Sequence, residues 1–304
     1  NKIMPLSDDL IVYPNHGAGS ACGKNMSKET TDTLGHQKEV NYALNPALNK
    51  EEFIKAILTG LTPPPGYFPK NVLMNIQGYE SLDTVLERGH KALTAENFEM
   101  VANETNALVL DTRNATDFAN GFIPNSINIG LDGSFAQWVG EMIPDIKQEI
   151  LLVSNPGYED EAMIRLSRVG YDGSIGYLEG GFDAWKKAGK EVDTVKRITA
   201  EQFATIHENE KPLTIDIRKK SEFQSQHITD AVNIPLNEIN NHLAEFPKDK
   251  PFILHCAGGY RSMIAASMLK QRGWDNFSDV IGGFTEIAKT NVPKSEYICP
   301  STML

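Results

Sequence analysis

The chain has 304 residues, which is too long for one ordinary hydrophobic core and favours two or three domains. It holds 40 acidic and 29 basic side chains, so neither nucleic acid nor an anionic membrane surface is expected as its main partner. No apolar run approaches the roughly 20 residues that span a bilayer, and no membrane or secretory segment is expected. Three cysteines without paired spacing, Cys22, Cys256 and Cys299, fit a reducing compartment, so a cytoplasmic protein is expected.

Residues 1–92 combine one strand pattern, at 10–14, with helical patterns near 31–43, 50–61 and 79–92. Three consecutive prolines, 63–65, interrupt the chain between the helical patterns. One strand and a few helices make a poor independent core at this length, so we expect the end of a larger domain. The first residue is Asn rather than Met, which suggests that the chain begins partway through a longer gene product.

The remainder of the chain contains an internal repeat. Residues 93–98 recur as residues 198–203, a shift of 105 residues, and the similarity continues downstream. A repeat of this length is the size of a domain, so the sequence predicts a tandem duplication. We name residues 93–195 the first copy and residues 196–304 the second copy.

Each copy alternates short apolar strands with helical stretches. Strands are predicted at 107–110, 150–153, 213–217 and 251–254, and helices at 161–169 and 263–271. Thr94 and Thr199 have the sequence context of helix N-caps. This alternation predicts an α/β fold in each copy, with a mainly parallel sheet flanked by helices.

The second copy carries a candidate nucleophile at a strand-to-helix turn. Cys256 closes an apolar strand pattern, and the helical pattern begins only a few residues later. Backbone N–H groups at a helix N-terminus stabilise negative charge, and Arg261 adds a cation, so the thiolate form of Cys256 should be favoured. We therefore predict that Cys256 and Arg261 are catalytic. The substrate-binding residues of the same loop are predicted to be Ala257, Gly258, Gly259, Tyr260 and Ser262.

The size of this loop indicates what it binds. Six residues run from Cys256 to Arg261, one fewer than in the loop with which cysteine phosphatases encircle a phosphate. A smaller ring of amides suits a sulfur atom carried on the cysteine, formed by attack of the thiolate on a sulfane sulfur. A cysteine phosphatase or arsenate reductase remains an alternative, as does a sulfur carrier that receives sulfur without catalysing turnover.

Several segments of the second copy, in order, resemble a rhodanese domain: 216–218, 222–223, 227–228, 231–235, 256–262 and 282–284. The resemblance implies a sulfurtransferase that carries a persulfide on Cys256, with a small sulfane-sulfur donor, such as thiosulfate or a thiol persulfide, and a thiol acceptor. Asp216 and Arg218 are predicted to form an ion pair that supports the loop, because Asp111 and Arg113 persist in the first copy.

The first copy resembles the same family but lacks the nucleophile. The position of Cys256 falls on Ser154, or on Val153 if the gap is placed differently, and Arg261 corresponds to Glu159. The first copy is therefore predicted to be a degenerate domain that cannot form a persulfide. His227 of the second copy corresponds to Phe122, so a place at the active face and a purely structural role are equally open.

Residues 12–25, with Gly35 and 45–48 behind them, resemble the closing part of the metallo-β-lactamase fold in persulfide dioxygenases fused to tandem rhodanese domains. The resemblance implies mononuclear iron or zinc in the complete domain, with His16 as the last histidine of that metal site. A turn histidine that binds no metal in this chain is the alternative for His16. The other ligands of that site are absent from these 304 residues, so no cofactor is expected in this chain. Relatives of the metal domain often dimerise, so the resemblance is compatible with a homo-oligomer of this chain.

Overall fold

The structure is a computed structural model that describes residues 2–14, 30–58 and 66–298. It divides into two compact units, one of residues 1–63 with 299–304 and one of residues 64–298. Within the described ranges, no helix is both long and apolar enough to cross a membrane.

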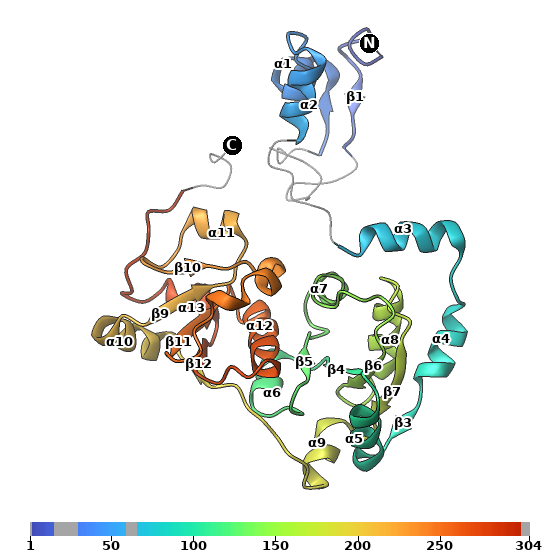
Figure 1. The fold of residues 1–304 in the computed structure, drawn as a ribbon. Helices are drawn as coiled ribbons and strands as arrows, with labels where there is room; N and C mark the ends of the chain where they lie inside the picture. The colour runs from blue at the N-terminus through green and yellow to red at the C-terminus, as the bar shows by residue number, and fades with distance from the viewer. Residues whose placement is uncertain (1, 15–29, 59–65, 299–304) are drawn as a thin grey trace. The chain divides into compact units, whose positions relative to one another are not determined.

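The front unit contains little regular structure (Figure 1). Strands β1 (Ile11–Val12) and β2 (Asp32–Thr33) pair antiparallel, and helices α1 (Leu34–Val40) and α2 (Lys50–Leu58) follow, separated by a 3₁₀ turn, η1 (Tyr42–Leu44). Thr33 caps α1 because its side chain accepts a hydrogen bond from the His36 amide. Leu34 is the only buried apolar residue among those described in this unit, so these elements form no substantial core.

Two helices outside the repeat, α3 (Phe68–Gln77) and α4 (Leu82–Gly89), belong to the second unit. Lys70 donates a hydrogen bond to the Pro144 carbonyl, and Arg88 donates one to the Asp172 carbonyl, so both helices are tied to the first copy. Residues 64–92 therefore belong to the same compact unit as the two copies. Helix α3, which begins with a proline in its first turn, was not predicted.

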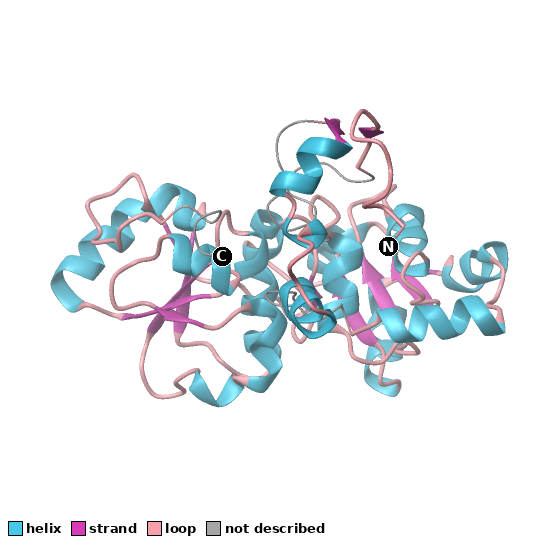
Figure 2. Ribbon diagram, turned by 90° about the horizontal axis from the view of Figure 1, so that it is seen from above, coloured by secondary structure: helices cyan, strands magenta, loops and turns pink. Residues whose placement is uncertain are grey.

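The first copy forms a five-stranded parallel sheet in the order β3-β7-β6-β4-β5. Helices cover both faces of this sheet, as Figure 2 shows for both copies. Its elements are β3 (Ala92–Leu93), α5 (Ala95–Glu104), β4 (Leu108–Asp111), α6 (Ala115–Ala119), β5 (Ile127–Asn128), α7 (Phe135–Met142), β6 (Ile150–Val153), α8 (Glu159–Ser167), β7 (Ser174–Leu178) and α9 (Gly181–Lys187).

The second copy repeats this topology in the order β10-β9-β11-β12-β8, again with every pair parallel. The α/β fold, the predicted strands and the caps at Thr94 and Thr199 are confirmed. Its elements are β8 (Arg197–Ile198), α10 (Ala200–Glu210), β9 (Leu213–Asp216), α11 (Lys220–Ser225), β10 (Val232–Asn233), η2 (Leu236–Asn241), η3 (Leu243–Glu245), β11 (Phe252–His255), α12 (Tyr260–Gln271), β12 (Phe277–Val280) and α13 (Gly283–Ile287).

Alternate residues of each central strand enter different hydrophobic clusters. In β6, Leu151 and Val153 face a cluster local to the first copy, whereas Ile150 and Leu152 enter a larger cluster. This larger cluster also includes residues of the second copy, among them Leu254 of β11. Side chains that alternate between the two faces of a buried sheet explain why these strands read as continuous apolar runs.

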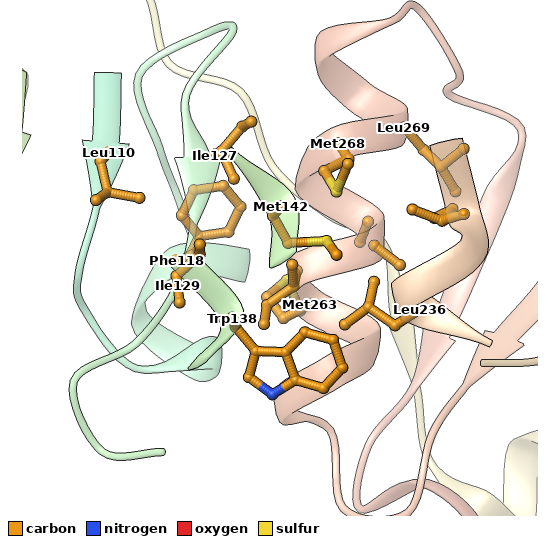
Figure 3. Close-up of a cluster of buried hydrophobic side chains, with 14 of the residues drawn as sticks. Leu110, Phe118, Ile127, Ile129, Trp138, Met142, Leu236, Met263, Met268 and Leu269 are labelled. Atoms are coloured by element: carbon orange, nitrogen blue, oxygen red, sulfur yellow. The ribbon is translucent and has the colours of Figure 1, made fainter. Parts of the chain in front are cut away.

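Helix α12 lies where the cores of the two copies meet. Figure 3 shows Met263 and Met268 of this helix beside Ile127 and Met142 of the first copy. The Asn128 amide donates a hydrogen bond to Ser267 Oγ over 3.0 Å, which ties α12 to strand β5. Residues 262–269 of the helix are all buried. The helix that starts at the cysteine loop is therefore packed by both copies at once.

Candidate active site

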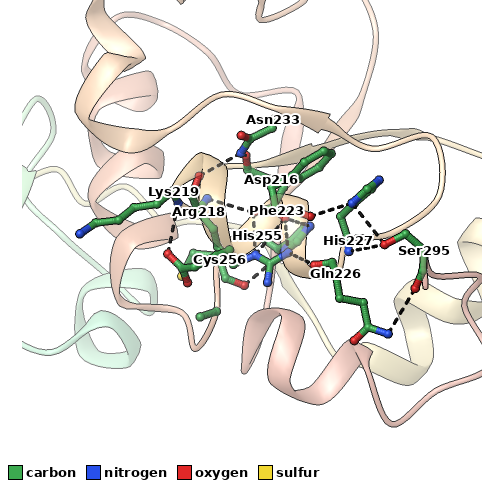
Figure 4. Close-up of polar contacts among 12 residues, drawn as sticks. Asp216, Arg218, Lys219, Phe223, Gln226, His227, Asn233, His255, Cys256 and Ser295 are labelled. Atoms are coloured by element: carbon green, nitrogen blue, oxygen red, sulfur yellow. Dashed lines mark hydrogen bonds and ion pairs between the residues drawn. The ribbon is translucent and has the colours of Figure 1, made fainter. Parts of the chain in front are cut away.

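Cys256 lies directly after β11, at the carboxyl edge of the second sheet, and α12 begins four residues later. Its residue exposure is 1%, and the Gly259 N–H donates a hydrogen bond to Cys256 Sγ over 3.1 Å. Gly259 has a φ of 104°, a left-handed conformation that suits glycine and lets its amide face the sulfur. Figure 4 shows Cys256 among the polar side chains around it. The predicted arrangement of a thiol at a helix N-terminus is present.

The first turn of α13, which follows the neighbouring strand β12, supports the cysteine loop. The Phe284 amide donates a hydrogen bond to the Cys256 carbonyl over 2.7 Å, and the Thr285 amide donates one to the Ala257 carbonyl over 3.0 Å. Gly283 has a φ of 54°, and a Cβ there would overlap the Cys256 carbonyl oxygen. These contacts fix the first two residues of the cysteine loop, while a side chain at Gly258 would meet open space.

Arg261 makes a two-pronged ion pair with Glu222 of α11. Its Nη1 and Nη2 atoms lie 2.6 and 2.8 Å from the two carboxylate oxygens. Burial opposes the charge of the guanidinium, but the Glu222 carboxylate and the nearby Cys256 raise the pKa of Arg261 overall. Burial likewise opposes the charge of Glu222, yet Arg261 lowers the pKa of that carboxyl overall. The predicted cation, Arg261, is thus present at the loop, but the Glu222 carboxylate already binds both of its terminal nitrogen atoms.

Asp216 and Arg218 form the expected ion pair at the end of β9. Arg218 Nη2 lies 2.6 Å from Asp216 Oδ2 and also donates a hydrogen bond to the Gln226 carbonyl. The guanidinium covers the ring of Phe284 at 4.0 Å from its centroid, which connects the pair to the first turn of α13. The first copy repeats the same contacts with Asp111, Arg113, Gly121 and Phe182.

A second buried ion pair, between Asp279 and Arg197, has no counterpart in the first copy. Arg197 Nε lies 3.0 Å from Asp279 Oδ2, and burial raises the pKa of this carboxyl to about 6, although Ser262 and Arg197 act to lower it. The strand registers place Tyr177 and Ala92 at these two positions in the first copy. This pair was not predicted from the sequence, where the only signal is that both positions are charged in the second copy and uncharged in the first.

His255, the residue before the cysteine, is also specific to the second copy. It is fully buried, its Nδ1 lies 3.2 Å from the Cys256 carbonyl, and its Nε2 has no hydrogen-bond partner among the described residues. Burial lowers the pKa of His255, although Asp216 opposes this effect, so the neutral imidazole is favoured. From the sequence pattern His255 is interpreted only as a strand-end residue, and it is the last residue of β11.

His227 follows α11 in the chain and packs back on that helix. Its ring stacks on Phe223 with 3.9 Å between centroids, its Nδ1 lies 2.7 Å from the Phe223 carbonyl, and Ser295 lies beside it. These contacts explain the position of the His227 side chain as packing on α11, without the need for any interaction with the Cys256 sulfur.

Ser262, in the first turn of α12, donates a hydrogen bond to the Gly259 carbonyl over 3.2 Å.

In the corresponding loop of the first copy, the Glu159 carboxylate binds a backbone amide of the loop itself. Ser154 stands at the cysteine position and lies 2.8 Å from Thr112 Oγ1. The Gly157 amide, which corresponds to that of Gly259, donates a hydrogen bond to Glu159 Oε2 over 2.8 Å. Glu159 therefore supplies the negative charge that a bound anion would otherwise bring to this loop.

No three His, Cys, Asp or Glu side chains converge in a metal-binding arrangement within residues 2–14, 30–58 and 66–298. The predicted metal residue His16 lies outside these ranges, as do Cys22 and Cys299.

Comparison with known proteins agrees with this architecture. Residues 94–188 and 199–290 each match the rhodanese-like domain family. The uncharacterised protein YqhL of Bacillus subtilis is 36% identical over 90 residues, which cover 30% of this chain and 70% of that protein. The thiosulfate sulfurtransferase GlpE of Pseudomonas syringae is 34% identical over 99 residues, which cover 33% of this chain and 92% of that enzyme.

A crystal structure described as a metallo-β-lactamase from Staphylococcus aureus is also similar. It is 30% identical to this chain, with a TM-score of 0.43, and the likeness covers 58% of this chain and 47% of that one. This chain therefore spans about half the length of that protein.

Proposed function

Because the chain belongs to the rhodanese-like family, with two tandem domains, we propose that its second copy is a sulfurtransferase with Cys256 as the nucleophile. The observation that carries the proposal is the hydrogen bond from the Gly259 amide to Cys256 Sγ, at the start of α12. This amide and the helix N-terminus favour a thiolate before transfer and a terminal sulfur anion after it. The similarity to thiosulfate sulfurtransferases supports the same reaction class.

The proposed reaction has two steps. The Cys256 thiolate attacks the outer sulfur of thiosulfate, the sulfur–sulfur bond of the donor breaks, and sulfite leaves with the bonding electron pair. The cysteine then carries a persulfide, Cys–S–S⁻. An acceptor thiolate attacks the terminal sulfur, takes it as a new persulfide and returns the Cys256 thiolate, so the kinetics are ping-pong. A thiol persulfide can replace thiosulfate as donor, with a thiolate as leaving group.

The surroundings of the sulfur restrict the donor. Cys256 lies at the base of a six-residue loop with only 1% exposure, so a slim terminal sulfur atom suits it better than a bulky group. Arg261 provides the cation that an anionic donor needs in a chain of net charge -11. The six-residue loop also disfavours the phosphatase alternative.

We further propose that this module works within a persulfide dioxygenase fusion in the cytoplasm. The support is the resemblance of residues 12–25 to the end of that metal domain, together with the order of front segment, degenerate copy and second copy. Among the described residues of the front unit only Leu34 is a buried apolar residue, which is too little for a core of its own.

Replacement of Cys256 by Ser tests the transferase proposal. Wild-type protein incubated with thiosulfate should gain one sulfur atom on the peptide that contains residue 256, and should pass it to cyanide or a thiol. The Cys256→Ser variant should do neither, whereas Ser154→Ala should leave both unchanged. Sulfur transfer that survives in Cys256→Ser would refute the proposal. A stable adduct without transfer would support a carrier, and hydrolysis of para-nitrophenyl phosphate would support a phosphatase.

A further inference from the structure

Tyr260, between Gly259 and Arg261, extends from the cysteine loop into the first copy. Its hydroxyl donates a hydrogen bond to the Gly130 carbonyl over 2.8 Å. Its ring lies against Gly133, where an added Cβ would overlap the ring atoms. Burial raises the pKa of the Tyr260 phenol, and Asp132 beside it adds to this effect. A residue of the candidate active loop is thus held by the degenerate domain.

The segment that receives Tyr260, residues 130–133, is fixed within the first copy. The Leu131 amide donates a hydrogen bond to the Thr112 carbonyl over 3.0 Å, and Arg165 of α8 donates one to the Leu131 carbonyl over 2.7 Å. The Phe135 amide, at the start of α7, donates one to the Gly133 carbonyl over 2.8 Å. We call residues 130–133 the tyrosine socket. Because its backbone is tied to the residue that follows β4 and to two helices, it can hold the Tyr260 ring in one place.

The first copy provides an internal comparison for this contact. Its loop also carries a tyrosine, Tyr158, directly before α8, and 51% of Tyr158 is exposed. A tyrosine at this loop position is therefore not buried by the loop itself. Tyr260 is partly buried because it packs against the tyrosine socket, which contacts the cysteine loop of the second copy.

The place of Tyr260 in the loop gives this contact a chemical consequence. The residue before it supplies the amide that faces Cys256 Sγ, and the residue after it supplies the guanidinium. A displacement of the Tyr260 backbone would therefore move both groups, and the contacts of its side chain oppose such a displacement. Misplacement of such groups by a fraction of an ångström lowers rates severely, because they must meet a sulfur anion at hydrogen-bond distance.

We propose that Tyr260 is a positioning residue and that the degenerate copy, through the tyrosine socket, holds the cysteine loop in the geometry needed for sulfur transfer. The inference rests on the proposed function of Cys256. It assigns the first copy a role in the reaction even though it touches no reacting atom. The first copy can lose its own nucleophile and still be required.

The variant Gly133→Ala tests this role in the full chain. Its new methyl group should displace the Tyr260 ring and lower kcat for transfer from thiosulfate to cyanide by about tenfold, with a smaller change in KM. The rate at which iodoacetamide alkylates Cys256, followed by mass spectrometry of its peptide, should change by at least threefold. Gly66→Ala, at a position where a Cβ meets nothing within 4 Å, is the matched control and should behave as wild type.

A double-mutant cycle separates positioning from a general loss of structure. Once Tyr260→Ala has removed the ring, Gly133→Ala should cause no further loss of kcat and no further change in alkylation. Tyr260→Phe, which removes only the hydroxyl and retains the packing, should lower kcat by about threefold. Tyr158→Phe, the same change in the first copy, should have no effect.

Three results would overturn the inference. These are a Gly133→Ala protein with a lower Tm but unchanged kcat and alkylation rate, additive losses in the cycle, and a Tyr260→Phe protein with unchanged kcat and alkylation. Failure of the proposed function would look different, because wild-type Cys256 would then gain no sulfur from thiosulfate. The alkylation rates would still report whether the socket holds the loop.

Discussion

The guanidinium of Arg261 is held by the carboxylate of Glu222 through two hydrogen bonds of 2.6 and 2.8 Å. An anionic donor that approaches Cys256 must therefore share this cation with a carboxylate already bound to it. In the first copy the same two positions hold Asp117 and Glu159, both acidic, so no comparable pair can form there. The pair is thus a difference between the cysteine loop of the second copy, where a cation is available to an anionic donor, and the loop of the first copy, where both positions are acidic.

Glu222→Gln should strengthen binding of anionic donors. Removal of one negative charge leaves Arg261 with a neutral partner that an anion displaces more easily, so KM for thiosulfate should fall by about fivefold, the equivalent of about 1 kcal/mol. Steady-state kinetics at constant ionic strength measures this change. Glu208→Gln, an exposed charge in α10, controls for net charge. A raised KM would mean that Glu222 chiefly orients Arg261.

The degenerate loop should regain sulfur binding only when Glu159 is also changed. In the Cys256→Ser background, Ser154→Cys alone should gain no sulfur from thiosulfate, because the Glu159 carboxylate occupies the Gly157 amide and repels a thiolate. Adding Glu159→Arg should free that amide and produce a one-sulfur mass increase on the peptide that contains residue 154. An adduct on Ser154→Cys without the second change would contradict this account.

Two equivalent glycines should separate stability from activity. Gly283→Ala would press on the Cys256 carbonyl, and Gly181→Ala would bring a Cβ to 2.7 Å from the Ser154 carbonyl. Both positions have positive φ, so both variants should lose about 1–3 kcal/mol of stability. Gly283→Ala should also lower sulfur transfer by about tenfold, since it displaces the cysteine loop. Transfer by Gly181→Ala should stay within about twofold of wild type; an equal loss in both would point to unfolding alone.

Asp279 should make stability fall as the pH rises. Its folded-state pKa of about 6 lies above the ordinary value of 3.8, so the folded protein holds this proton more tightly than the unfolded chain. Between pH 5 and 7.5 this group should therefore remove about 1 kcal/mol of stability. Asp279→Asn should abolish that share of the pH dependence of Tm, although loss of the partner of Arg197 lowers Tm at every pH. Asp249→Asn, an exposed change, should leave the dependence as in wild type.

The repeat and the hydrophobic pattern together predicted the fold of both copies. Strands such as β6 are apolar on both faces, and caps such as Thr94 and Thr199 are local signals, so both are visible in one sequence. Helix α3 was missed because its start is a proline-rich stretch that reads as a break.

The cysteine loop was also predictable, but its partners were not. Cys256, Gly259 and Arg261 are close in sequence, and their residue types indicate an anion-binding turn. Glu222 lies 39 residues before Arg261, and the socket at Gly130 lies 130 residues before Tyr260. Such contacts depend on how the copies pack, and a single sequence carries no local signal for them.

Helix α12 has one further consequence, for unfolding. Its buried residues contribute to a cluster that contains side chains of both copies, so the helix has no core of its own to retain if the first copy opens. The two copies should therefore melt in a single cooperative transition, despite being duplicates that could have folded separately. A duplicated domain that has lost its chemistry can in this way become inseparable from the one that kept it.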